Sequence, residues 1–88
     1  MDMAIAAAIV SSFKNKALRE KMAIMGEVGL AGEVRPVAYP EKRAQEAEKL
    51  GMTCLLAPKG TKARLRNSGI DVLEAGTLIE LLDLAFRQ

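Results

Sequence analysis

The chain has 88 residues, of which 50% are hydrophobic and 3% aromatic, and its formal net charge is +2. Histidine is absent and Cys54 is the single cysteine, which excludes histidine-based catalysis, internal disulfides and four-ligand zinc sites. The longest apolar run, residues 3–10, is too short to span a membrane and follows an acidic residue, so we expect no membrane span, no signal peptide and a cytoplasmic location.

The first part of the chain predicts a helix followed by a β-hairpin. Residues 3–13 are alanine-rich and apolar nearly all round, which indicates a buried helix. Residues 22–28 and 33–37 predict two strands. The link between them, residues 29–32, begins and ends with glycine, which favours a hairpin turn.

The second part predicts alternating helices and strands. Pro40 begins a helix that we expect to end at Leu50, with Gly51 as its left-handed terminator. Residues 52–57 and 70–75 predict strands, the first of them buried on both faces. Thr77-Leu78-Ile79-Glu80 is a capping box that begins the last helix. This alternation indicates a sheet with helices packed against it.

Motifs for catalysis and nucleotide binding are weak. Three glycines recur at every third position between residues 26 and 32, but they do not form the G-x-G-x-x-G pattern. Residues 59–62 lack the upstream glycine of a phosphate-binding loop. We interpret Cys54 as a buried, inert thiol, and Ser11 and Ser12 as helix-end hydroxyls without a base.

Positive charge is concentrated in residues 59–66, the basic segment, within a stretch that we predict to be a polar loop or a frayed turn. No acidic residue interrupts its four cations, which are Lys59, Lys62, Arg64 and Arg66. One interpretation is a loop that contacts nucleic-acid phosphates and releases counterions. The other, which is the commoner case, is a solvated loop whose charge keeps the protein soluble. Both interpretations stay open from the residues alone.

The most distinctive block of the sequence is Gly-Glu-Val-Gly-Leu-Ala-Gly-Glu-Val-Arg-Pro-Val at residues 26–37. It resembles the hairpin signature of the RadA (Sms) family of bacterial DNA-repair proteins, in their C-terminal Lon-protease-like domain. Matching segments before and after it follow in the family's order. The resemblance implies that residues 1–88 are a C-terminal part of that domain. The fold class is then α/β (α+β), with a hairpin and short strands forming a sheet packed by three helices.

The resemblance implies a function that the residues do not show. Proteins of this family carry a zinc finger and a RecA-like ATPase domain, and they process recombination intermediates by ATP-driven branch migration as hexameric rings. We therefore expect ATP, magnesium and zinc in other domains of the parent protein, and no cofactor or metal in this chain. This chain would be a non-catalytic scaffold that helps to hold DNA. Its candidate DNA-contacting residues are Lys59, Lys62, Arg64 and Arg66.

The similarity to Lon proteases raises the question of peptidase activity. Alignment through Val34, Pro36 and Val37 places the catalytic lysine of Lon at Glu41, where a carboxylate cannot serve as the amine base. The nucleophilic serine would fall before Met1. We therefore expect no catalytic residues, although a Ser-Lys peptidase remnant and a stand-alone α/β assembly module remain as alternatives. A domain without its first strands leaves a sheet edge uncovered, which predicts self-association by edge pairing or by packing of the residue 3–13 helices.

Overall fold

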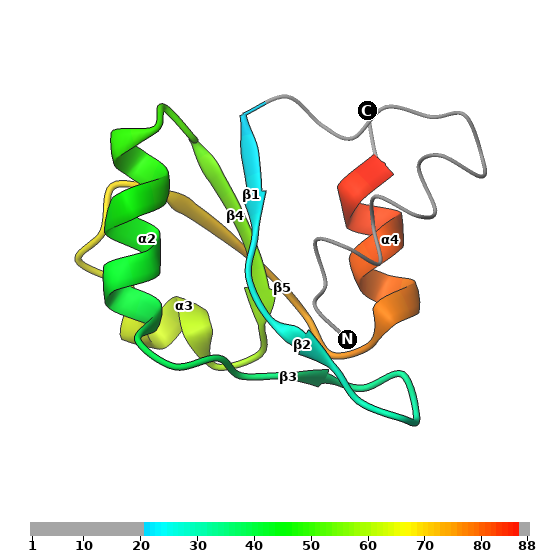
Figure 1. Ribbon diagram of the computed structural model, residues 1–88. Coiled ribbons are helices and arrows are strands. Elements are labelled where there is room, and N and C mark those ends of the chain that lie inside the picture. The colour runs from blue at the N-terminus through cyan, green and yellow to red at the C-terminus, as the bar shows by residue number, and fades with distance from the viewer. Residues whose placement is uncertain (1–20, 87–88) are drawn as a thin grey trace.

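Three parallel strands form the central sheet of the computed structural model, which describes residues 21–86 (Figure 1). The strands are β1 (Met22–Ile24), β4 (Cys54–Pro58) and β5 (Asp71–Ala75), in the order β1-β4-β5. Ala23 lies opposite Leu55, and Leu55 lies opposite Val72. The α/β class predicted from the alternating elements is confirmed. The predicted helix at residues 3–13 lies outside the described residues.

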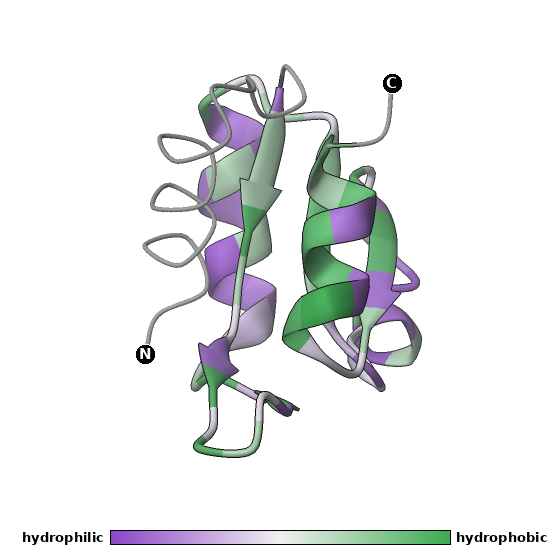
Figure 2. Ribbon diagram, turned by 90° about the vertical axis from the view of Figure 1, so that its right-hand side faces the viewer, coloured by the Kyte–Doolittle hydropathy of each residue, from purple (hydrophilic) through white to green (hydrophobic). Residues whose placement is uncertain are grey.

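Helices cover both faces of this sheet. Helices α2 (Pro40–Lys49) and α3 (Thr61–Arg64) lie on one side and α4 (Leu78–Phe86) on the other (Figure 1). Figure 2 shows α2 as largely hydrophilic in colour and α4 as largely hydrophobic. Parallel strands joined by helical crossovers are normally buried in this way on both faces.

The sheet separates two hydrophobic clusters because neighbouring residues of a strand point to opposite faces. Leu55 belongs to the α2 side and Leu56 to the α4 side, and both are at most 2% exposed. The α2-side cluster consists of Met25, Ala44, Ala47, Leu55, Ala57, Leu65, Ile70 and Val72. The α4-side cluster consists of Leu56, Ala75, Leu81 and Ala85. β4 is thus the central strand, and its last four residues are buried, as its uninterrupted apolar sequence predicts.

The strand predicted at residues 22–28 is divided in two, and the prediction of one continuous strand is wrong. Gly26, at φ 148°, lies between β1 and β2 (Glu27–Val28) in a conformation that favours glycine. β1 belongs to the parallel sheet, whereas β2 pairs with β3 (Val34–Arg35) as a separate antiparallel hairpin. β3 ends before Pro36, which has no N–H to donate to a ladder.

The hairpin is attached to the start of α4. The N–H of Val34 donates to the carbonyl of Gly76 at 2.9 Å, and the N–H of Leu78 donates to the carbonyl of Gly32 at 2.8 Å. At the same junction the predicted Thr-x-x-Glu cap forms in part, because the carboxylate of Glu80 accepts from Gly76 rather than from the N–H of Thr77. The N–H of Glu80 donates to Thr77 Oγ1 at 3.2 Å, and the Glu80 carboxylate accepts the N–H of Gly76 at 3.3 Å. The hairpin, β5 and α4 therefore meet at one corner of the fold.

The remaining sequence predictions are confirmed at the ends of α2 and corrected elsewhere. Pro40 begins α2, and Gly51, at φ 85°, follows the helix in the left-handed region. Cys54, which we predicted to be buried, is half-buried because it is the first residue of β4. Residues 59–68, predicted as a polar loop or a frayed turn, contain the helical turn α3. Within residues 21–86, no helix is long and apolar enough to cross a membrane.

Candidate nucleic-acid interface

The basic segment folds as a short amphipathic turn rather than as an irregular loop. Gly60, at φ 93°, is the N-cap of α3, and a residue with a side chain adopts this conformation at a cost. Thr61 and Leu65 are four residues apart, lie on one side of the turn and are buried at 7% and 5% exposure. The four cations of the segment, Lys59, Lys62, Arg64 and Arg66, are all exposed. Burial of two residues thus directs the cations outward.

A carboxylate from the neighbouring strand fixes the beginning of this turn. Glu74, on β5, lies opposite Ala57 of β4 in the sheet. Its Oε2 atom accepts the backbone N–H of Gly60 at 2.8 Å and that of Lys62 at 2.9 Å. The first N–H groups of a helix have no partner within the helix, so a carboxylate there is a stabilising acceptor.

A second carboxylate holds the chain just after the segment. Glu48, on α2, accepts a hydrogen bond from the hydroxyl of Ser68 and another from the backbone N–H of Gly69 at 3.1 Å. The Ser68 hydroxyl oxygen also accepts the N–H of Ile70 at 3.2 Å. The backbone that carries the four cations is therefore held at both ends by residues outside the basic segment.

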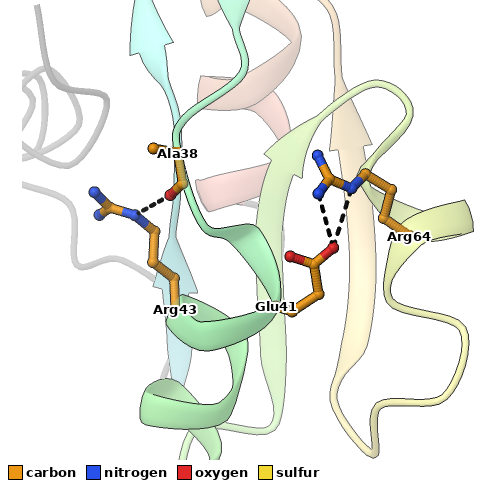
Figure 3. Close-up of polar contacts among 4 residues, drawn as sticks. All are labelled: Ala38, Glu41, Arg43 and Arg64. Atoms are coloured by element: carbon orange, nitrogen blue, oxygen red, sulfur yellow. Dashed lines mark hydrogen bonds and ion pairs between the residues drawn. The ribbon is translucent and has the colours of Figure 1, made fainter.

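One of the four cations is already paired. Oε1 of Glu41 lies 2.9 Å from Nη2 of Arg64 and accepts a hydrogen bond from its Nε at 3.1 Å (Figure 3). The side chains remain 52% and 60% exposed, respectively. The structure thus brings Glu41, which the resemblance to Lon aligns with the catalytic lysine, against the basic segment. No sequence pattern links these two residues, which are 23 positions apart.

The other three cations, Lys59, Lys62 and Arg66, form no ion pair with another residue of the described range. Exposed positive side chains on an anchored backbone are suited to phosphate groups, which contact proteins mainly through lysine, arginine and backbone N–H groups. The arrangement therefore provides a cationic surface with three side chains that can contact phosphate and a fourth, Arg64, that is paired with Glu41.

Acidic residues border this surface on the α2 side. A groove of about 350 Å³ between α2 and α3 is lined by two carboxylates, Glu41 and Glu48, and by one guanidinium, that of Arg64. Within residues 21–86, no group of three or more histidine, cysteine, aspartate or glutamate side chains is arranged to hold a metal ion. The groove is thus polar and of mixed charge, in contrast to the exposed cations beside it.

Comparison with known proteins shows the family of this chain. Residues 1–61 match the family model described as subunit ChlI of Mg-chelatase, and the chain belongs to this family. The resemblance to RadA that the residue 26–37 block indicates is also confirmed, because curated DNA repair proteins RadA match nearly the whole chain.

Three of these relatives come from different bacteria. The RadA protein of Streptococcus pyogenes serotype M3 is 41% identical over 87 residues, which is 98% of this chain and 19% of the relative. That of Pseudomonas aeruginosa is 38% identical over 85 residues, or 97% of this chain and 19% of the relative. That of Synechocystis sp. is 36% identical over 85 residues, or 97% of this chain and 17% of the relative. The chain thus spans about a fifth of the length of the curated relatives it matches.

Proposed function

We propose that this chain is a non-catalytic scaffold and DNA-contacting portion of a RadA-like DNA-repair protein. The observation that carries the proposal is the basic segment, whose backbone is anchored by Glu74 and Glu48 while three of its cations face solvent unpaired within the described range. The RadA relatives supply the DNA-repair context. A fixed cationic turn binds the phosphate backbone without reading its sequence, which suits a protein that acts on DNA of any sequence.

Salt-dependent DNA binding tests this proposal. Fluorescence anisotropy would follow a labelled single-stranded oligonucleotide with the 88-residue chain and with Lys59→Gln, Lys62→Gln and Arg66→Gln. Each lost phosphate contact should weaken binding and reduce the slope of log K against log salt by about 0.7. The matched control for each single variant is Lys49→Gln, which removes one positive charge from the exposed end of α2. The proposal fails if all three single variants bind with the affinity and slope of this control.

The proposal includes the absence of peptidase chemistry from this chain. Support comes from Glu41, whose carboxylate accepts hydrogen bonds from Arg64 at the position of the Lon lysine. An ion-paired carboxylate does not provide the amine base of a Ser-Lys pair. ATP, magnesium and zinc would belong to other domains of the parent. Labelling of the intact parent protein at a serine by a fluorophosphonate probe would contradict this part, whereas no labelling is the expected result.

The scaffold role rests on surfaces that another chain could cover. Within the described residues, β1 pairs with β4 alone and forms one edge of the parallel sheet. A groove of about 330 Å³ lies beside it, and Leu50 on its rim is 76% exposed. Unpaired edges and exposed apolar side chains favour association. Light scattering at micromolar concentrations should therefore report an oligomer, and a monomer throughout that range would contradict the scaffold role.

A further inference from the structure

We propose that the ion pair with Glu41 keeps Arg64 from contacting DNA. Arg64 is then not one of the phosphate contacts, although it becomes one when Glu41 is removed. This inference rests on the proposed function, because it concerns the same basic segment. It separates four residues that look equivalent in the sequence into three available cations and one restrained cation. Glu41 is then a positioning residue that limits the affinity of the surface.

The geometry of the pair supports a restraint that is specific but weak. Both donor atoms of Arg64, Nε and Nη2, converge on the same oxygen of Glu41, at 3.1 Å and 2.9 Å (Figure 3). An arginine that pairs with both oxygens of a carboxylate or phosphate forms a stronger, forked contact. Because both side chains are more than half exposed, the pair is a surface ion pair, and it contributes little to stability. One substitution is enough to release Arg64.

The surroundings explain why a phosphate does not simply displace Glu41. The pair forms within one folded chain, so Arg64 is already held by Glu41 when DNA arrives. A phosphate that approaches Arg64 from the groove also meets the negative charges of Glu41 and Glu48, which line it. Glu41 lies in the first turn of α2, where the helix dipole favours a negative charge.

The backbone of the basic segment does not depend on Glu41. Glu74 holds Gly60 and Lys62, and Glu48 holds Gly69. Release of Arg64 therefore changes the direction of one side chain and leaves the turn in place. A substitution at Glu41 thus tests the restraint itself rather than the folding of the segment.

The experiment measures single-stranded oligonucleotide binding by the 88-residue chain as a function of salt. Glu41→Gln should tighten binding and steepen the slope of log K against log salt by about 0.7, the value of one added phosphate contact. Arg64→Gln alone should leave the slope unchanged. The double variant should lose the gain of Glu41→Gln, because no cation is left to release.

The matched control is Glu46→Gln, which removes one negative charge from an exposed position of the same helix, on the side of the β1 groove. Equal slopes for the Glu41 and Glu46 variants would overturn the inference, and so would a gain that persists in the double variant. If Lys62→Gln still weakens binding in that case, the proposed DNA contact stands and only the restraint fails. If no substitution in the segment alters the slope, the proposed function fails as well.

Discussion

The carboxylate of Glu74 accepts the backbone N–H of Lys62 at 2.9 Å, although the two residues are 12 positions apart. The contact connects β5 to the first turn of α3, and the same oxygen also accepts the N–H of Gly60. An acidic side chain thereby sets the place of a positively charged surface. Its role is to order the backbone, and the cations themselves point elsewhere, to solvent.

The hydrogen bonds that Glu74 accepts predict that removing this negative charge weakens DNA binding, although added positive charge normally strengthens it. Glu74→Ala makes the chain more positive, yet it should weaken binding because α3 loses the acceptor for two N–H groups. The unfolding free energy should fall by about 1.5–3 kcal/mol, the scale for hydrogen bonds to a charged group. Urea denaturation and anisotropy together measure both effects. Tighter DNA binding by this variant than by Glu46→Gln would show that the anchor does not order the surface.

The capping box predicts a moderate loss of stability at Thr77. Its Oγ1 atom accepts the N–H of Glu80, one of the first N–H groups of α4. Thr77→Ala should lower the unfolding free energy by about 0.5–2 kcal/mol, while Thr77→Ser, which keeps the hydroxyl, should lose less. Thermal denaturation followed by circular dichroism compares the three proteins. Equal losses in both variants would assign the effect to the methyl group rather than to the cap.

The α4-side core predicts a large difference between two residues of one helix. Leu81 is 0% exposed and Ile79 is 81% exposed. Leu81→Ala removes buried methyl groups and leaves a cavity, so it should cost about 2–5 kcal/mol. Ile79→Ala should change the unfolding free energy by about 0.5 kcal/mol or less. Chemical denaturation of both variants checks the order, and similar losses would mean that α4 does not pack as described.

The hairpin predicts that Gly32 is needed for its backbone conformation and not for space. Its φ is 82°, and a Cβ atom built at this position meets nothing within 4 Å. Gly32→Ala should therefore cost about 1–2 kcal/mol through backbone strain alone. Differential scanning calorimetry measures the loss. Because no clash is involved, Gly32→Asn, a residue that tolerates the left-handed region, should recover part of it; no recovery would contradict this explanation.

Local patterns predicted most of the elements correctly. The proline at the start of α2 has no N–H that needs a partner, and the glycine after its end and the Thr-x-x-Glu box before α4 help to satisfy nearby backbone groups. These local effects depend on neighbouring residues, which therefore contain the needed information. The sequence does not show where residues 22–28 divide. The pairing with β4 continues as far as Met25, whose N–H donates to Leu56 at 2.8 Å, and residues 27–28 pair with β3 instead. The pairing of β1 depends on a strand far along the chain.

The sequence by itself determined the fold class, the ends of α2, the start of α4, the hairpin, the family and the location of the four cations, because composition, periodicity and local motifs act over short distances. Only the tertiary structure decided which of those cations are available. Arg64 is paired because α2 brings Glu41 beside α3, and the basic turn is ordered because β5 places Glu74 at its start. Both contacts join residues at least 12 positions apart, and packing of the sheet and helices, rather than any local pattern, brings them together.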